Sequence, residues 1–398
     1  MSGSLARPAL ILGLLSCLGP FAIDMYLPAM PVIGSSLGAS PQLMQSTITA
    51  YFAAFGIAQM LYGPWADQVG RKIPLYAGIG MFVLGTLLCL TATSAMGLIA
   101  GRFVQGLGGA ALGVVPRAIV RDMMTGTEAT RMMAKLFLVF SVSPMLAPLA
   151  GSALLVVTGW RGIFAALLVA SVVSLGLLTF AQPETLSPDN RRPFRLGFLI
   201  KGCAALFKDR SFLLLTFIGA FGFGSFFIFL AAASYVYQQG FGLSSTQFSL
   251  AFAVNAMAFI GASQAAGKAT TRFGAMPMLK GASFGFAFCA FGLFALALAG
   301  LMNLWVCIVG LALANAFLGL IIPSTMVMAL DDQGDKAGLA SSLGGTMQML
   351  TGGVLVVALG PWLGASPTPM IGGIAFAAVV TLILTLWVAA PQAAERTA

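Results

Sequence analysis

Apolar runs long enough to cross a lipid bilayer follow one another along almost the whole chain. A membrane-spanning helix needs roughly 17 to 25 residues, and the sequence holds twelve such runs, interrupted by glycine and proline rather than by charge. Charged residues make up 8% of the 398 residues, whereas soluble domains carry about a quarter. Strands of a membrane barrel alternate polar and apolar residues, so runs this continuous indicate helices. The sequence predicts an all-α polytopic membrane protein.

The twelve predicted spans cover most of the chain. They are residues 9–30, 43–63, 73–92, 96–118, 132–156, 162–181, 211–236, 246–267, 277–299, 302–326, 337–360 and 367–390. The first run follows a basic residue and imitates a signal peptide, but it continues for a full membrane crossing, so we expect an uncleaved first helix. The five cysteines have no paired spacing, so neither a disulfide framework nor a metal site is indicated.

The basic residues indicate how the chain is oriented. Nearly all of the 20 lysines and arginines fall in loops on one side of the predicted membrane, whereas Arg161 lies on the other side and Arg102 lies within a span. An excess of lysine and arginine marks cytoplasmic loops, so we expect both termini in the cytoplasm. The net charge of +9 is explained by this asymmetry, and no nucleic-acid partner is expected.

One acidic residue stands apart from the others. Asp24 is predicted inside the first span, every other acid lies at or beyond the cytoplasmic boundary, and the chain has no histidine. A carboxyl group in a low-dielectric environment resists ionisation, and a nearby positive charge opposes that effect. We therefore expect Asp24 to carry protons and Arg102 to modulate its proton affinity. The alternative is a structural acid that braces a helix end interrupted by Pro20, Pro28 and Pro31, although an ionised carboxylate cannot donate to free carbonyls.

The chain divides into two halves around one long polar segment. The predicted units are residues 1–183, a cytoplasmic linker at 184–210 and residues 211–398. Within the linker, Phe194–Phe207 fits an amphipathic helix on the membrane surface or a flexible tether. The stretch GPWADQVG between spans two and three returns as GKATTRFG, Gly267–Gly274, between spans eight and nine. Six plus six related helices are typical of transporters that bind substrate between their halves.

The stretch GPWADQVGRK resembles the loop signature of the major facilitator superfamily, and the resemblance covers the whole chain. It implies two pseudo-symmetric six-helix bundles with charges at an inner gate. The residues that match the signature are Gly63, Asp67, Gly70, Arg71 and Lys72. Glycines permit a tight turn between helices, and the three charges can pair with neighbouring helix ends. The alternative is that the two bases only set topology.

Two further stretches resemble signatures of proton-driven exporters. RFVQGLGGAALG, which begins at Arg102, is similar to their fourth-helix pattern. An arginine within a span costs roughly 2.5 to 3.5 kcal/mol on insertion scales, so it faces a cavity or a partner, unless it snorkels to the membrane surface. SPMLAPLAG is similar in part to the fifth-helix antiporter pattern, with Pro144, Pro148 and Gly151 as its candidate residues. Packing of small residues alone also explains this stretch.

DMYLP, at Asp24–Pro28, resembles the first-helix pattern of the bicyclomycin and chloramphenicol resistance exporters, and RAIVRDM, at Arg117–Met123, fits the same group. The resemblance implies a monomeric drug and proton antiporter of the bacterial inner membrane. It needs no cofactor besides the proton gradient, and it exports small amphipathic drugs of the phenicol or bicyclomycin class. Arg121 and Asp122 become candidates for pairing with Asp67 and Arg71 across the inner gate.

Aromatic and amide side chains within the spans are candidates for drug contact. They are Tyr26, Tyr51, Gln59, Phe221, Phe227, Tyr235, Asn255 and Asn315. A proton-coupled importer or exporter of a small metabolite on the same fold is the alternative function. A channel or an intramembrane enzyme is less consistent with the sequence, because the predicted spans contain neither a ring of charges nor paired catalytic acids.

Overall fold

The computed structural model describes residues 6–124, 126–191, 193 and 196–388, and every regular element within them is helical. The elements are α1 (Ala6–Asp24), η1 (Leu27–Ala29), α2 (Met30–Ser36), α3 (Pro41–Val69), α4 (Lys72–Leu90), α5 (Ala95–Met123), α6 (Gly126–Thr158), α7 (Trp160–Phe180), η2 (Pro188–Asn190), α8 (Leu196–Leu206), α9 (Arg210–Tyr235), η3 (Val236–Gly240), α10 (Ser245–Phe273), α11 (Ala275–Leu298), α12 (Leu304–Asp331), η4 (Gly334–Lys336), α13 (Ala337–Leu359) and α14 (Pro367–Trp387).

Each predicted span coincides with one long helical segment, so the predicted fold class is confirmed. The first crossing consists of α1, η1 and α2 together, and it is broken after Asp24. Ten segments are long and apolar enough to cross a membrane, and α6 contributes a shorter apolar stretch, Val142–Thr158. The segment α3 is more polar because residues such as Gln45 and Gln59 lie on it. Several helices extend past the predicted boundaries, since hydropathy marks the apolar part of a helix and not its ends.

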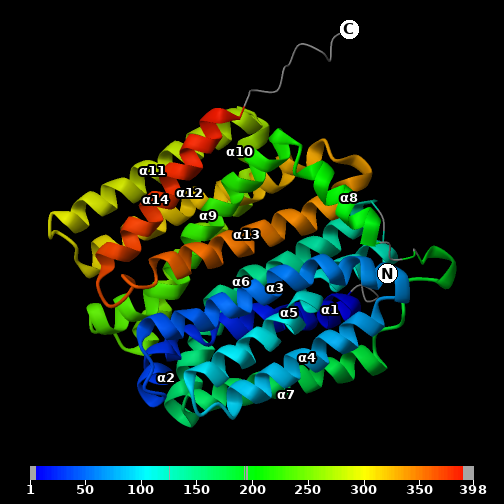
Figure 1. The fold of residues 1–398 in the computed structure, drawn as a ribbon, viewed down its shortest axis with the longest axis horizontal. Helices are drawn as coiled ribbons and strands as arrows, with labels where there is room; N and C mark the ends of the chain where they lie inside the picture. The colour runs from blue at the N-terminus through cyan, green and yellow to red at the C-terminus, as the bar shows by residue number, and fades with distance from the viewer. Residues whose placement is uncertain (1–5, 125, 192, 194–195, 389–398) are drawn as a thin grey trace, which may run out of the picture.

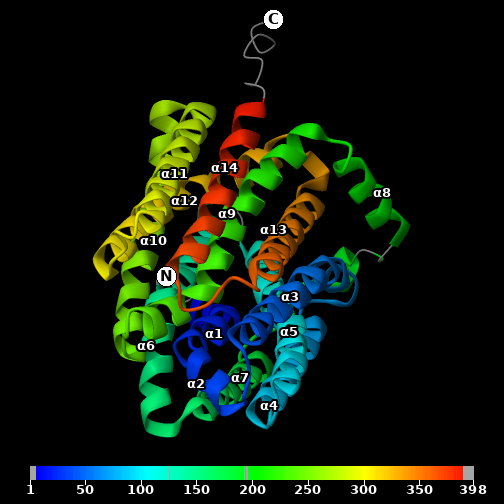
Figure 2. The same ribbon diagram turned by 60° about the vertical axis from the view of Figure 1, so that its left-hand side comes forward.

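The helices form two groups that lie side by side (Figure 1). Helices α1 to α7 occupy the lower part of that view and α9 to α14 the upper part, and the turned view keeps them apart (Figure 2). The groups meet where α3 packs on α13 and α6 packs on α10. Within the first group, α5 lies against α3 at Gly106, where any side chain would collide with the backbone of Tyr51. Small residues allow such close helix contact inside a membrane.

The two copies of the repeated loop make the same turn. Gly70 ends α3 with φ of 100°, and Gly274 ends α10 with φ of 84°. This backbone region strongly favours glycine. In each group the turn leads directly into the next helix, so the repeat seen in the sequence corresponds to equivalent places in the two groups.

The segment between the groups contains a helix rather than only a tether. Residues 196–206 form α8, which lies at the same end of the bundle as the start of α1 and the end of α14 (Figure 1). Phe194 and Arg195 of the predicted amphipathic stretch lie outside the described residues. Gly202 of α8 lies against the side chain of Leu339 on α13. The linker helix is therefore seated on the second group of helices.

Candidate functional site

Arg102 lies inside the first group of helices and has no exposed surface. Its Nη1 donates to the carbonyl oxygen of Ala22 at 2.9 Å and to Oε1 of Gln105 at 2.6 Å. The guanidinium also lies over the rings of Tyr26 and Tyr51, 4.9 and 4.6 Å from their centroids, a geometry that favours cation–π attraction. The side chain therefore points inward, and the snorkelling alternative is wrong.

The Arg102 guanidinium is incompletely satisfied. Its Nε and Nη2 atoms are buried and have no hydrogen-bond partner among the described residues. Gln105, which accepts from Nη1 of Arg102, is itself held in place, because its Nε2 donates to Oγ1 of Thr86 on α4 at 2.9 Å. A continuous chain of hydrogen bonds thus joins α4, α5 and α1. Since a buried polar group without a partner is costly, the two free donors make this a site for an acceptor.

Asp24 ends α1 and is 6% exposed. Two prolines explain the end of the helix: Pro28 lacks the N–H that would serve the carbonyl of Asp24, and Pro31 lacks the one that would serve Leu27. No hydrogen bond to the Asp24 carboxyl group is found in the described part of the chain, and Asp24 and Arg102 form no ion pair there. Arg102 instead binds the backbone two residues earlier. The structure brings the two predicted proton-coupling residues to one segment without pairing them.

The predicted antiporter helix lies beside this segment. A side chain at Gly151 of α6 would collide with the carbonyl oxygen of Met25, which directly follows Asp24. Pro148 of the same helix is buried, and its carbonyl accepts a hydrogen bond from Ser249 of α10 at 2.9 Å. Pro144 is half-buried one turn earlier. Helix α6 therefore contacts both the Asp24 segment and the second group of helices.

The charges of the loop signature form a compact cluster around Arg71. Its Nη1 donates to Asp67 at 2.6 Å, while Nε and Nη2 donate to the two carboxylate oxygens of Asp122 at 2.6 and 3.1 Å. Burial lowers the pKa of Arg71, and the two carboxylates more than reverse that effect, so its pKa is raised. Asp67 pairs with Arg71 and not with Arg121, which is exposed. The predicted pairing of Arg121 with Asp67 is therefore wrong.

Glu184 completes this cluster, and the sequence reasoning missed its role. Its carboxylate accepts from the backbone N–H groups of Arg71 at 2.9 Å and Lys72 at 3.1 Å, at the start of α4. It also accepts from the N–H groups of Thr185 and Leu186. Burial raises the pKa of Glu184, but these four donors outweigh burial and lower it.

The turn at Gly70 accommodates Glu184 directly. A side chain at Gly70 would meet the Glu184 carboxylate, which adds a second reason for glycine there besides its backbone angle. Thr185 donates to Asp122 at 3.1 Å, so the linker binds two members of the Arg71 cluster. A usable signal existed in the sequence: Glu184 is an acid in a mostly basic linker, and the free N–H groups at a helix start attract an acid. Gly63, at the start of the signature, lies within α3 in open space.

The predicted drug-contact residues fall into separate places. Tyr26 and Tyr51 belong to the Arg102 site, and Phe227 of α9 stacks on Phe52 across the two groups with ring centroids 3.9 Å apart. Asn315 donates to Asn255 at 3.1 Å inside the second group.

Three predicted contact residues remain. Gln59 is buried beside Gly345 of the second group, and its Nε2 has no partner in the described residues. The Tyr235 hydroxyl reaches the carbonyl of Met30 at 3.5 Å, and Phe221 is half-buried on α9. The structure therefore does not gather the predicted set around one cavity.

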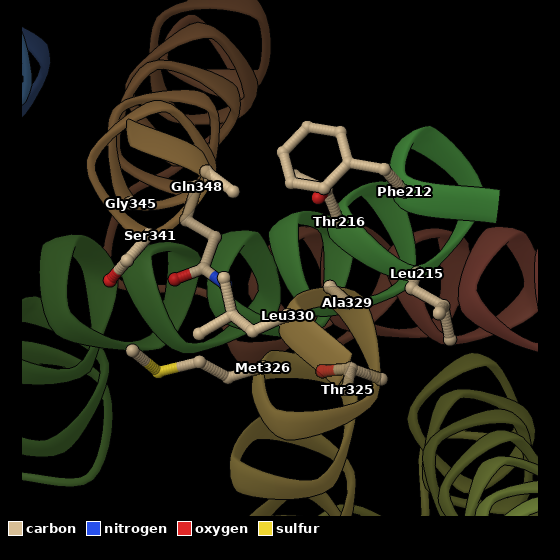
Figure 3. A pocket seen from close by; sticks show the side chains of 12 residues that line it. Phe212, Leu215, Thr216, Thr325, Met326, Ala329, Leu330, Ser341, Gly345 and Gln348 are labelled. Atoms are coloured by element: carbon tan, nitrogen blue, oxygen red, sulfur yellow. The ribbon is translucent and has the colours of Figure 1, made fainter. Parts of the chain in front are cut away.

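Two cavities are lined by other residues, although Gly345, which lies beside Gln59, lines the first. The first, of about 40 Å³, lies between α9, α12 and α13, and Thr216, Thr325 and Gln348 are among its lining residues (Figure 3). That volume is enough for a few water molecules. The second, of about 370 Å³, is an apolar space between α1 and α7 lined by residues such as Phe21 and Leu167. Neither cavity includes a predicted drug-contact residue.

Comparison with known proteins shows the family and the fold of the chain. The family model of the Major Facilitator Superfamily matches residues 12–356. The bicyclomycin resistance protein homolog of Haemophilus influenzae is 31% identical over 87% of this chain and 87% of its own length. Multidrug resistance protein D of Escherichia coli is 30% identical over 87% of this chain and 86% of its own length. The crystal structure of a D-xylose-proton symporter shares the fold, with a TM-score of 0.75, 14% identity and 96% of both chains covered.

The bacterial relatives and the membrane-spanning helices identify a multi-pass protein of the bacterial inner membrane. Several of its relatives are named as resistance proteins, which indicates small-molecule substrates. The chain belongs to the Major Facilitator Superfamily, within the subfamily of bicyclomycin and chloramphenicol resistance transporters.

Proposed function

We propose that this transporter exports small amphipathic drugs of the bicyclomycin or phenicol class in exchange for protons. Asp24 carries the proton, and Arg102 sets how easily it is released. One observation carries the proposal: Asp24 is buried and its carboxyl group has no partner in the described part of the chain, two residues from the backbone carbonyl that Arg102 binds. The proton gradient is the energy source, no cofactor takes part, and the working unit is a monomer.

The chemistry of the Arg102 site supplies a coupling mechanism. A buried carboxylate without a partner is strongly unfavourable, so Asp24 stays protonated until an acceptor for its proton and a partner for its charge are present. The Nε and Nη2 donors of Arg102 have no partner among the described residues and provide that partner when the segment moves to meet them. Drug binding that brings the two together favours proton release to the cytoplasm, and external protons reverse it as drug leaves.

The contacts between the helix groups support an inward-facing state. Gln45 donates to the carbonyl of Leu363 at 3.3 Å, near the end of the bundle remote from α8, and Thr346 donates to that of Gly56 at 2.6 Å near the middle. In the described residues, no side-chain hydrogen bond joins the groups at the α8 end. The distribution of basic residues supports a cytoplasmic position for α8 and both termini. On this orientation the end remote from α8 is the outer side, and it is closed.

Alternating access then follows as rocking of one group against the other about the shared site. The moving units are residues 1–183 and 211–398, joined by the linker at 184–210. Each proton that enters down a potential of ~100 mV contributes roughly 2.3 kcal/mol, which is enough to concentrate a neutral drug severalfold.

The test is proton movement in proteoliposomes that carry an imposed pH gradient. A pH-sensitive dye reports flux as chloramphenicol, bicyclomycin or a lipophilic cation is added, for the native protein and for Asp24→Asn. We expect drug-triggered proton flux in the native protein and its loss in Asp24→Asn. Equal flux in both proteins would disprove the carrier role of Asp24. Absence of flux with every drug would favour a metabolite transporter instead.

A further inference from the structure

The break after Asp24 exposes backbone carbonyls inside the membrane. The carbonyl of Leu27 faces Pro31, which has no N–H to donate, and within its own segment it accepts from Met30 in a tight turn. Backbone polar groups at this depth need partners because lipid offers none. The partners come from the second group of helices, more than 200 residues away in sequence.

Two side chains of that group bind the break directly. Ser234 of α9 donates through Oγ to the carbonyl of Leu27 at 2.6 Å, and Gln238 of η3 donates through Nε2 to the carbonyl of Pro28 at 3.0 Å. Both donors are at least partly shielded from solvent, and Ser234 is fully buried. Together with the longer hydrogen bond from Tyr235 to the carbonyl of Met30, at 3.5 Å, these two hydrogen bonds join α9 and its continuation to the first crossing segment.

The two donors belong to one ordered network. Nε2 of Gln238 also donates to Oγ of Ser234 at 2.8 Å, while Ser245 at the start of α10 donates to Oε1 of Gln238 at 3.2 Å. Each group thus has a defined role as donor or acceptor. Gln238 lies in η3, a π-helical turn that continues α9, and such turns occur frequently at functional sites.

The segment that carries Asp24 is held on both sides. Before it, Arg102 of the first group binds the carbonyl of Ala22 at 2.9 Å. After it, Ser234 and Gln238 of the second group bind the carbonyls of residues 27 and 28. When the groups separate at this end, the second set of bonds must break while the first can persist. The conformation around Asp24 therefore depends on whether the outer side is closed.

We propose that Ser234 and Gln238 are positioning residues that couple the proton site to the outer gate. They hold the break in its present shape while the outer side is closed, and they release it when that side opens. The proposal rests on the proposed function, because it assigns the proton to Asp24 and assumes alternating access. Nothing about the drug enters it.

The experiment measures how far the outer gate is open, as a distance between two labels, and does not depend on transport. Spin labels are placed at Thr93, in the loop after α4, and at Leu301, in the loop after α11, in full-length protein whose five native cysteines are replaced. Both positions are exposed and lie at the end remote from α8. Pulsed electron paramagnetic resonance in lipid nanodiscs gives the distance distribution between them. We expect a closed, short-distance population to dominate in this background.

The variants are Ser234→Ala and Gln238→Leu, alone and together. Loss of two hydrogen bonds should shift the balance toward the longer distance by roughly tenfold. Ser234→Thr, which keeps the hydroxyl, should restore the short distance. The matched control is Ser225→Ala on the same helix, because Ser225 is buried and bonds only to the carbonyl of Gly222. An unchanged distribution in the double variant, or an equal shift in the control, would overturn the proposal.

A further variant tests the coupling. Asp24→Asn mimics the protonated acid, the form of Asp24 proposed for the state in which the outer side is closed. We expect it to favour the short label distance and to act non-additively with Gln238→Leu, as residues of one network do. Additive effects would show that the gate and the proton site are independent. Because no flux is measured, a failure here leaves the flux test of Asp24 intact. Conversely, if the flux test disproved proton antiport, the label distances would still show whether Ser234 and Gln238 hold the outer side closed.

Discussion

Arg71 donates hydrogen bonds from two nitrogens to the carboxylate of Asp122, at 2.6 and 3.1 Å, and so links the turn between α3 and α4 to the end of α5. The Arg71 side chain is only 7% exposed, and the breaking of a shielded pair leaves an uncompensated charge. The cluster also includes Glu184 and Thr185 of the linker, which bind Arg71 and Asp122. It therefore holds the end of the first group of helices to the start of the linker.

Removal of one partner should impair the transporter. We expect Asp122→Asn to lower drug export by at least about tenfold, and the double exchange Arg71→Asp with Asp122→Arg to recover part of the loss. Export is measured as drug accumulation in everted membrane vesicles. The control is Arg121→Gln, since Arg121 is adjacent in sequence but exposed, and it should leave export unchanged. Equal losses in Asp122→Asn and Arg121→Gln would refute a specific role for the pair.

Glu184 should make thermal stability depend on acidity. Its pKa lies below the ordinary value of 4.5 in the folded protein, so its stabilising effect is complete above that value and is lost as pH falls through the folded pKa. We expect Glu184→Gln to lower the melting temperature at pH 7, and the difference from native protein to shrink below about pH 4.5. Melting curves across pH test this, with exposed Asp189→Asn as the control. A difference that stays constant down to pH 3 would contradict the assignment.

Arg102 should matter more for transport than for folding. Two of its nitrogens are buried and have no partner among the residues that the structure describes. Replacement of a poorly paired buried charge by an apolar side chain is often neutral or stabilising. We expect Arg102→Met to abolish drug-dependent proton flux without a lower melting temperature. Arg102→Lys should also lose most activity, because an ammonium lacks the planar fork that reaches two acceptors. A strongly destabilised Arg102→Met would instead indicate a structural arginine.

Gly151 should tolerate no side chain. A methyl group there would collide with the carbonyl oxygen of Met25, so Gly151→Ala should push α6 away from the Asp24 segment. We expect a destabilisation of about 1–3 kcal/mol together with reduced proton flux. Gly176→Ala on α7 is the control, because its position opens into free space. Equal melting temperatures and equal proton flux in the two variants would show that the close packing of α6 on α1 is not needed for function.

The elements predicted best from the sequence are those marked by a local pattern of consecutive residues. Run length located the crossings, and the two glycines of the repeated loop marked the equivalent turns. The predicted pair of Asp122 with Arg71 is present, whereas Arg121 does not pair with Asp67 among the described residues. The reason is geometric: adjacent residues on a helix point about 100° apart, so Asp122 joins the cluster while Arg121 is exposed. Hydropathy carries no information on which of the two faces the cluster.

The remaining site residues depend on contacts that leave no local pattern. Glu184 acts on backbone N–H groups, which every residue except proline possesses. Ser234 and Gln238 meet the first crossing segment only in the folded bundle. The aromatic and amide candidates could not be sorted for a similar reason, since nearly uniform apolar helices do not reveal which face points inward.

The broken first segment has a consequence for how the protein is made. The carbonyls of Leu27 and Pro28 obtain their outside partners from Ser234 and Gln238, and these are synthesised only after six crossings have entered the bilayer. The amino-terminal half by itself would therefore lack the donors that Ser234 and Gln238 supply to these two carbonyls within the membrane. The first segment to insert obtains these partners only when the seventh crossing is in place, so the two halves, expressed separately, should be more stable together than apart.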